Sequence, residues 1–503
     1  MRRSAAPYAP YAALFAIGLA VYGLFAWDRI GRQSAAPHFV YQADAWLRGE
    51  LAIRPSCGPC GPDLACEPPP PACTGRASPL PNDDWAFVET IVRRDGTEAS
   101  GRRLATRRAF RTQGGAELPL EDIASSRGFT AYNSFPPLPA LLMLPGVLVS
   151  GRAANDVLPT LIAAALILPL ALLVLRRLAG AGLSARTLRE DLWLVAMLAF
   201  GSVLFFSSVQ GKVWYTAHVA GMVLALIYAW ASIEAKHPVL AGVALGAAAL
   251  ARTSMAFMFP LFVLEAWRMA ARRASEEGAA GAATPAASAS MNLRAGRAAM
   301  RRMLVRPLVR FAVPVAAFAA AGMIYNQVRF GSPLEFGHTY LSLGNHQPVY
   351  QQTQIEQWGL AHYHYLSRNL AVAFTQLPEL LPRAPWIQIS GHGLAMWVTT
   401  PALLLLLWPR EKNPLHRTLW VTAALVALPS LFYMNSGWFQ FGYRFSLDYL
   451  VFLVMLLAIG GRPLTRFVKG LIVVGIVVNA FGAATFDRHG KYYRGAINVV
   501  VPN

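Results

Sequence analysis

The chain has 503 residues, of which 55% are hydrophobic and only 14% are charged. A soluble chain carries about a quarter charged residues, so this composition argues against a soluble enzyme. The formal net charge of +19 could point to nucleic acid, but the basic residues lie in short segments between apolar runs. That distribution is typical of multi-pass membrane proteins, which keep positive charge inside. We therefore expect a protein that contacts membrane lipid and binds no nucleic acid.

Apolar runs predict about eleven membrane helices, because most of them can cross a hydrocarbon core of about 30 Å. The first run, residues 11–27, follows Arg2 and Arg3. It lacks a convincing small-residue cleavage site, so we expect a retained helix and not a signal peptide. The other predicted spans are 157–175, 192–209, 219–232, 239–250, 255–267, 308–325, 393–408, 419–434, 445–459 and 471–486.

Clusters of arginine and lysine between these runs predict which helix ends are cytoplasmic. The resulting topology exposes two large loops, 28–134 and 326–392, on the other side, and we expect a bacterial inner membrane with a periplasmic active face. The predicted division of the chain is a first transmembrane helix (1–27), a first periplasmic loop (28–134), a first part of the membrane core (135–273), a cytoplasmic low-complexity linker (274–306), a transmembrane helix (307–325), a second periplasmic loop (326–392), C-terminal membrane helices (393–486) and a short periplasmic tail (487–503).

Three segments depart from simple spans. Residues 135–151 are apolar but short and contain four prolines, so we expect a helix that lies at the outer interface or dips into the membrane. The runs 239–250 and 255–267 are also short and flank Arg252, which suggests a partly buried hairpin. Residues 274–299 are rich in Ala, Gly and Ser and predict a cytoplasmic linker.

All four cysteines lie in the first outer loop, within SCGPCGPDLACEPPPPAC. The opening Cys-x-x-Cys resembles half of a zinc site, but zinc needs two well-spaced pairs, and the later spacings fit that poorly. Cysteines in an oxidising compartment form disulfides. We therefore expect two disulfides among Cys57, Cys60, Cys66 and Cys73, with all three connectivities open.

The rest of this loop alternates apolar and polar residues around the turn signals Asp95-Gly96 and Gly114-Gly115. Such alternation predicts a small β-rich insert. Its arginines form either a solvated basic hairpin or a surface that faces anionic lipid headgroups or phosphates. These arginines are Arg93, Arg94, Arg102, Arg103, Arg107, Arg108 and Arg111.

Several stretches carry motifs that can be compared with a known family. HFVYQADAWLRGEL (38–51) follows the first span and resembles the amphipathic helix that the GT-C class of membrane glycosyltransferases has at this place. AYNSFPPLPALLMLP (131–145) is similar to the Pro-Pro segment before the second span of the aminoarabinose and O-mannosyl transferases. QGKVWYTAH (210–218), followed by LARTS (250–254), also resembles the class. NQVRFGSPLEFGHTYL and WFQFGYRFSLDYL look like stretches of its uncharacterised bacterial members.

The resemblance implies an all-α polytopic enzyme that transfers a sugar, with inversion, from a polyprenyl-phosphate donor. The acceptor would be a periplasmic lipid, glycan or protein. In this class an acid precedes the Tyr that begins the first-loop helix, but here Pro37 and His38 precede Tyr41. The catalytic role then falls on Asp44 or Asp28, with or without a divalent metal.

Glycosyl transfer from a lipid phosphate needs an acid or base at the acceptor and cations at the departing phosphate. The candidate phosphate-binding residues are Lys212, Arg252, Arg329, Arg368, Arg444 and His218. Supporting candidates are His38, Glu335, His338, His362, His364, Asp448, Trp214 and Tyr215. If the chain is such an enzyme, we expect one outer cavity to contain Asp44, Lys212, Arg252 and Arg444.

Plainer interpretations stay open for these residues. Asp44 could belong only to the polar face of an interfacial helix, Arg252 could extend toward the interface, and Arg444 could pair with Asp448 four residues later. Two other functions also stay open. A transporter or flippase of lipid-linked sugars predicts internal repeats, of which the sequence shows no convincing example. An inactive assembly subunit is the third alternative.

Overall fold

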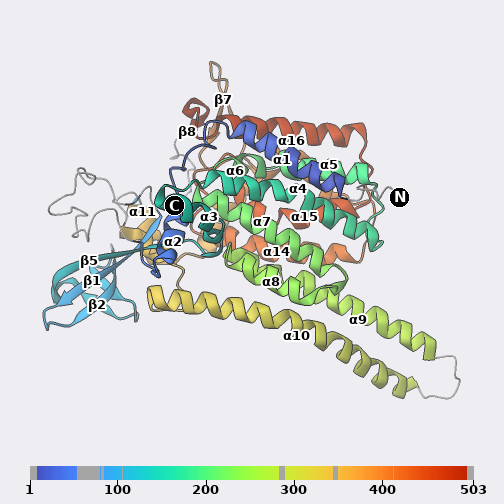
Figure 1. Ribbon diagram of the computed structural model, residues 1–503, viewed down its shortest axis with the longest axis horizontal. Helices are drawn as coiled ribbons and strands as arrows, with labels where there is room; N and C mark the ends of the chain where they lie inside the picture. Colours follow the sequence, from blue (N-terminus) through green and yellow to red (C-terminus); the bar gives the residue numbers. More distant parts are fainter. Residues whose placement is uncertain are drawn as a thin grey trace.

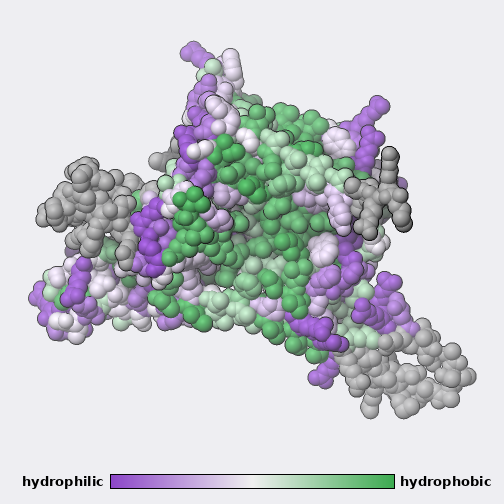
Figure 2. All heavy atoms as spheres, in the orientation of Figure 1, coloured by the Kyte–Doolittle hydropathy of each residue, from purple (hydrophilic) through white to green (hydrophobic). Residues whose placement is uncertain are grey.

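The computed structural model describes residues 8–53, 80, 84–104, 106–281, 289–343, 349–411 and 413–494. Apolar helices form a bundle, and a small β-sheet lies at one end of it (Figure 1). The surface of the bundle is mostly apolar along its middle and polar toward its two ends (Figure 2). This distribution is that of a bundle that sits in a bilayer. The four cysteines lie outside the described residues, so the two disulfides stay a prediction.

Among the described residues, six helical segments are long and apolar enough to cross a membrane, which supports a multi-pass membrane protein. They are Val157–Gly180 (α4), Val213–Ala235 (α7, Val213–Ser232, and the turn after it), Thr253–Glu276, Met303–Phe330, Leu415–Phe432 (α14) and Arg466–Thr485 (α16). Three further apolar helices are shorter, namely α1 (Ala9–Phe25), α8 (Pro238–Ala249) and α15 (Leu450–Ile459). The other two predicted spans are interrupted helices, α5 (Leu188–Phe200) with α6 (Leu204–Ser208), and α13 (Met396–Thr399) with η9 (Pro401–Leu407). The number eleven therefore stays a prediction.

Helix ends rich in arginine gather at one end of the bundle, here called the basic end. Arg177, near the end of α4, donates to the Glu234 carboxylate at 2.7 Å, just after α7. Arg186 donates to the carbonyl oxygens of Leu457 (2.8 Å) and Arg462 (2.9 Å) at the end of α15. The β-sheet lies at the opposite end, here called the sheet end (Figure 1).

The sheet is the β-rich insert predicted in the first loop. Its strand order is β4-β3-β2-β1-β5, and every neighbouring pair is antiparallel. Gly96 and Gly115 adopt positive φ values of 83° and 89° in the two predicted turns, where glycine has no steric cost. The strands are β1 (Trp85–Arg93), β2 (Glu98–Leu104), β3 (Ala109–Thr112), β4 (Glu117–Pro119) and β5 (Ile123–Asn133). Trp85 pairs with Asn133, so the two ends of the insert return side by side to the bundle.

Several arginines of the insert are neutralised within the sheet. Arg103 donates two hydrogen bonds of 2.8 Å to the buried Glu89 carboxylate. Arg107 and Arg111 both pair with Glu117. These ion pairs favour the solvated hairpin over a free basic surface for lipid headgroups.

Three predicted segments differ from the structure. The outer turn at 210–218 is shorter, because α7 begins at Val213 and continues as one apolar helix. The second half of the predicted hairpin is long enough to cross a membrane by itself, because the 3-10 helix η6 (Thr253–Met258) leads directly into α9 (Pro260–Gly281). The linker is helical on both sides of residues 282–288, since α9 runs to Gly281 and α10 (Ala289–Phe330) begins soon after. Alanine, the strongest helix former, accounts for this extension.

Helix α10 packs on α8 through glycines. Within Met303–Phe330, only 11% of the most apolar stretch of 18 residues is buried. A Cβ atom at Gly242 would overlap the Phe311 carbonyl oxygen, and one at Gly246 would lie 2.6 Å from the Phe318 Cβ. Positions four apart share one helix face. The two glycines therefore let α8 and α10 approach closely, as small residues do between membrane helices.

Replacing Gly246 by valine should separate α8 from α10. Overpacking a tight contact costs roughly 1–3 kcal/mol, so we expect a lower thermal unfolding midpoint for Gly246→Val in detergent. Gly23→Val in α1 is the matched control, because nothing lies within 4 Å of a Cβ at that position. Equal midpoints for the two variants would contradict the glycine contact.

Candidate functional site

A cavity of about 210 Å³ lies at the sheet end. It is bordered by the start of the β-insert, the first turn of α7, the turn between α8 and η6, and the loop after α14. Its polar and charged lining includes Asp84, Arg252, His338, Tyr433 and Arg444. Its aromatic lining includes Phe135, Trp214, Phe336 and Phe445. Such a mixture of aromatic walls and a few convergent polar groups is typical of a ligand site.

Arg444 brings a buried positive charge to this cavity. Arg444 is the first residue of the 3-10 helix η10 (Arg444–Asp448), and it is only 5% exposed. Nη1 donates to the carbonyl oxygens of Phe439 (3.1 Å) and Gly437, whereas Nε has no hydrogen-bond partner among the described residues. Burial lowers the pKa of Arg444, but a guanidinium stays protonated in proteins. Because no described carboxylate forms an ion pair with it, Arg444 can accept an anion.

Arg252 is held in place by a buried carboxylate. It adopts an extended backbone between α8 and η6, and its Nε and Nη2 donate to the two Asp448 oxygens at 3.2 and 2.9 Å. Ser254 donates to the same carboxylate at 2.5 Å, and the His218 Nδ1 lies 2.9 Å from it. The Arg252 Nη1 takes part in neither of these two hydrogen bonds. Arg252 is thus fixed at the cavity, and its Nη1 can donate to a ligand.

The electrostatic state of Asp448 follows from these contacts. The residue is 1% exposed. Burial alone would raise the pKa of Asp448. The charges of Arg252 and His218 and their hydrogen bonds lower this pKa by more, so that it lies well below the usual range. Of the interpretations left open for Arg444, the ion pair with Asp448 does not form, because Asp448 pairs with Arg252. Residues four apart do not share a face in a 3-10 helix, which has three residues per turn.

Asp84 is a cavity residue that the sequence analysis did not select. The Trp214 Nε1 donates to its carboxylate at 2.8 Å, and its backbone carbonyl accepts from the Ser134 hydroxyl at 2.7 Å. Burial and the Asp84 charge raise the pKa of Tyr433, and the Asp84 charge also acts on Arg444. The carboxylate therefore shares the cavity's electrostatic environment. The signal in the sequence was an acidic residue directly before the first strand of the insert.

The predicted first-loop helix, α2 (His38–Leu47), supports this carboxylate. The buried His38 ring stacks on Trp85 with centroids 4.0 Å apart, and Trp85 directly follows Asp84. His38 also meets Phe135 edge-on at 5.9 Å. Helix α2 thus holds Trp85, and with it the neighbouring Asp84, in position.

The two predicted catalytic acids lie elsewhere. Asp44 accepts from Arg152 Nε at 2.6 Å and from Arg48. Burial raises the pKa of Asp44, but these hydrogen bonds lower it by more, and the carboxylate stays ionised. Asp28 lines a second cleft, where the hydrogen bond from Arg488 lowers its pKa.

Arg252 and Arg444 therefore meet at one cavity as expected, whereas Asp44 and Lys212 do not. The physical reason is that each misplaced group already has a partner. Asp44 binds Arg152, and the Lys212 ammonium binds Asp487 at 2.7 Å in the second cleft.

The remaining candidates mostly have structural contacts. The buried Arg329 donates to the Asn133 carbonyl (2.7 Å) and joins α10 to β5. Arg368 donates to the carbonyl of Met434, which lines the cavity. Tyr215 donates to the Phe439 carbonyl at 2.9 Å.

The remaining candidates, Glu335, His338, His362 and His364, lie in the segment 326–392. Glu335 accepts from the Gly337 backbone N–H at 2.7 Å and so shapes the turn before His338, which lines the cavity. Burial lowers the pKa of His338 to about 4, so this imidazole is neutral at neutral pH. His362 and His364 stack on Trp358.

Metal ligands are not grouped in the part of the chain that the structure describes: no cluster of three or more His, Cys, Asp or Glu side chains there could hold an ion. The predicted role of a divalent metal stays open.

Comparison of the chain with models of protein families, with curated proteins and with solved structures gives no match in any of the three. The resemblance to the GT-C class therefore depends on the motifs alone, and the site is interpreted from its geometry.

Asp448→Asn should destabilise the fold. It removes the counter-charge of Arg252, and breaking a buried pair on one side costs roughly 3–5 kcal/mol, so we expect a large drop in the thermal unfolding midpoint. Glu117→Gln is the control, because exposed pairs such as Glu117 with Arg107 contribute about 0–1 kcal/mol. A drop no larger than that of the control would contradict the network.

The same carboxylate predicts a pH dependence. Because the pKa of Asp448 is lower in the folded state than the unfolded value of about 4, its stabilisation is present above that pH and is lost as the pH falls below it. We expect the unfolding midpoint of the wild type to fall steeply below about pH 4, and that of Asp448→Asn to fall less. Parallel pH profiles of the two proteins would show that Asp448 does not contribute.

Proposed function

We propose that this chain is a membrane glycosyltransferase that moves a sugar from a polyprenyl-phosphate donor to an acceptor on the periplasmic side. The observation that carries the proposal is the cavity at the sheet end, which two guanidinium groups and one carboxylate line together. The arginine-rich basic end lies opposite, and the positive-inside rule favours a cytoplasmic location for that end. This orientation supports a periplasmic cavity in a bacterial inner membrane.

Arg444 and Arg252 have the properties that the donor phosphate requires. Both are lining residues, and Arg444 has no carboxylate partner among the described residues. Guanidinium groups bind phosphate through several directed hydrogen bonds. In the transition state, negative charge grows on the bridging oxygen that leaves with the phosphate. Cations already in place there stabilise this charge without reorganisation.

Asp84 is the residue that we assign as the general base. Its carboxylate lines the same cavity and is oriented by the indole N–H of Trp214 at 2.8 Å. The acceptor hydroxyl would attack the anomeric carbon of the sugar and pass its proton to Asp84 as the new C–O bond forms. The bond from the anomeric carbon to the phosphate oxygen breaks, and its electron pair leaves with the polyprenyl phosphate. A single displacement of this kind inverts the anomeric centre.

The rest of the lining suits the other parts of the donor. Trp214, Tyr433 and Phe445 present aromatic surfaces against which a sugar ring can stack. An apolar wall of Leu341, Ile355, Leu360 and Pro429 offers a surface for the first isoprene units. The polar surface lies toward the two ends of the bundle, whereas its middle is mostly apolar (Figure 2). This placement favours transfer chemistry over a transport pathway, which would place charges at mid-bilayer.

Turnover should depend on Asp84. We would measure release of undecaprenyl phosphate from a panel of undecaprenyl-phosphate sugars, with cell-envelope extract as acceptor and the protein in detergent. Loss of a general base slows turnover by roughly 10²–10⁴-fold, and we expect this for Asp84→Asn. Arg444→Gln should slow it by roughly 10²–10³-fold, because a preorganised cation at the leaving phosphate is removed.

Asp44→Asn is the matched control for this assay, because it changes a first-loop carboxylate that lies outside the cavity. It should keep turnover close to that of the wild type. Loss of turnover in Asp44→Asn but not in Asp84→Asn would move the base to α2. A folded wild-type protein that binds the lipid but turns over no donor would favour the transporter or the inactive assembly subunit.

A further inference from the structure

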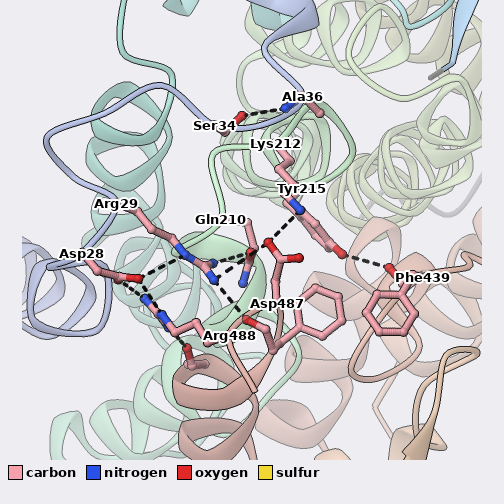
Figure 3. Close-up of polar contacts among 12 residues, drawn as sticks. Asp28, Arg29, Ser34, Ala36, Gln210, Lys212, Tyr215, Phe439, Asp487 and Arg488 are labelled. Carbon is pink, nitrogen blue, oxygen red and sulfur yellow. Dashed lines mark hydrogen bonds and ion pairs between the residues drawn. The ribbon is translucent and has the colours of Figure 1, made fainter. Parts of the chain in front are cut away.

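A second cleft, here called the α1–α16 cleft, lies at the sheet end near the ends of these two helices (Figure 1). Figure 3 shows several of its polar side chains. Its volume is about 1020 Å³. It receives side chains from the loop after α1, the turn before α7 and the loop after α16. The cleft is separate from the cavity. Between them, Tyr215 donates to the Phe439 carbonyl at 2.9 Å, and the Phe439 ring stacks on Phe486 at 5.1 Å.

The lining of this cleft carries excess positive charge. Four cationic side chains face two carboxylates, which leaves a net charge of +2: the cations are Arg29, Arg32, Lys212 and Arg488, and the carboxylates are Asp28 and Asp487. Asp28 accepts from Arg488 at 2.9 Å, and Asp487 lies 2.7 Å from the Lys212 ammonium. Burial and the nearby Arg488 lower the pKa of Arg29, as expected where cations crowd together. No described carboxylate pairs with Arg32.

A buried amide gives a second and independent indication of a ligand. Gln210 is 1% exposed and lines the cleft beside Arg29 and Asp487 (Figure 3). Its Oε1 accepts from Arg29 at 2.5 Å, whereas its Nε2 is buried without a hydrogen-bond partner among the described residues. Leaving a buried donor unsatisfied is unfavourable. An oxygen of a bound anion would satisfy it.

The position of the cleft indicates what kind of anion reaches it. Trp27 is 75% exposed and Leu24 is 68% exposed, and both line the cleft at the end of α1. Tryptophan is enriched where the hydrocarbon core meets the headgroups. The cationic side chains therefore lie beside the headgroup layer, with apolar side chains next to them for acyl chains.

We propose that the α1–α16 cleft binds the phosphate of an anionic lipid headgroup in the outer leaflet. Lys212, Arg29 and Arg32 supply the positive charge, and the Gln210 amide donates to a phosphate oxygen. The site is independent of sugar transfer, since it shares no lining residue with the cavity. A soluble phosphate has the same chemistry and is distinguished by the experiment.

The test is lipid binding to the full chain in a non-ionic detergent. We would measure dissociation constants by native mass spectrometry for phosphatidylglycerol, phosphatidylcholine and inorganic phosphate. We expect phosphatidylglycerol to bind most tightly. Because one Lys or Arg near an anionic lipid contributes on the order of a fivefold change in affinity, Lys212→Gln should weaken binding by about that factor.

Asp487→Asn should change the affinity in the opposite direction. It removes a carboxylate that competes with the phosphate for Lys212, so we expect roughly fivefold tighter binding. The substitution suits the backbone, because Asp487 has a φ of 61° and asparagine tolerates this region. Lys491→Gln is the control, because this exposed lysine lies outside the cleft. It should leave the affinity unchanged.

Weaker binding in both Lys212→Gln and Asp487→Asn would show that the ion pair is only structural, and the proposal would fail. It would also fail if phosphatidylcholine bound as tightly as phosphatidylglycerol, or if Lys491→Gln weakened binding as much as Lys212→Gln. Binding of inorganic phosphate without binding of phosphatidylglycerol would overturn the assignment to a lipid.

Discussion

One buried carboxylate organises the half of the bundle nearest the sheet end. Asp448 lies just before α15 and binds Arg252 from the turn after α8, His218 from α7 and Ser254 from η6. A charge in this position is costly unless each of its oxygens has partners, so these segments are held together. The cavity forms directly beside this junction, and Arg252 is both part of the network and part of the lining.

The first outer loop completes the cavity from the other side. The β1–β5 ladder returns the chain so that Asp84 lies next to Ser134, and the stack of His38 on Trp85 fixes the ladder to α2. The insert therefore places the Asp84 carboxylate at the cavity. The cations come from the turn between α8 and η6 and from η10, whereas the acid comes from the first loop. The site is therefore assembled only when this loop has folded onto the bundle.

The local features of this fold could be predicted from the sequence. Apolar runs located α4 and α14, and the glycines of the two turns located the hairpins of the insert. Pairing over long distances could not be predicted. Arg252 and Asp448 are 196 positions apart, and only the packed helices bring them together. The expected partner Arg444 is close in sequence, but the 3-10 geometry of η10 turns it away from Asp448.

Residues that are close in sequence line two different cavities in this structure. Lys212 lies in the α1–α16 cleft, whereas Trp214, two positions later, lines the cavity. The first turn of α7 separates the two spaces, and composition alone carries no information about this division. Asp44 lies outside the cavity for a similar reason, since it is on the expected helix but faces Arg152.

The glycine contact between α8 and α10 has a mechanical consequence. Helix α10 has 42 residues and is about 63 Å long, roughly twice the thickness of a hydrocarbon core. It packs on α8 and α9 and continues through Phe330 toward η7 (His338–Leu343), which contributes His338 to the cavity wall. The apolar stretch of α10 within Met303–Phe330 is only 11% buried, the smallest share among the six candidate spans of the described residues. The glycine contact with α8 therefore holds against the bundle the least buried of these spans, which is also the one that leads to His338.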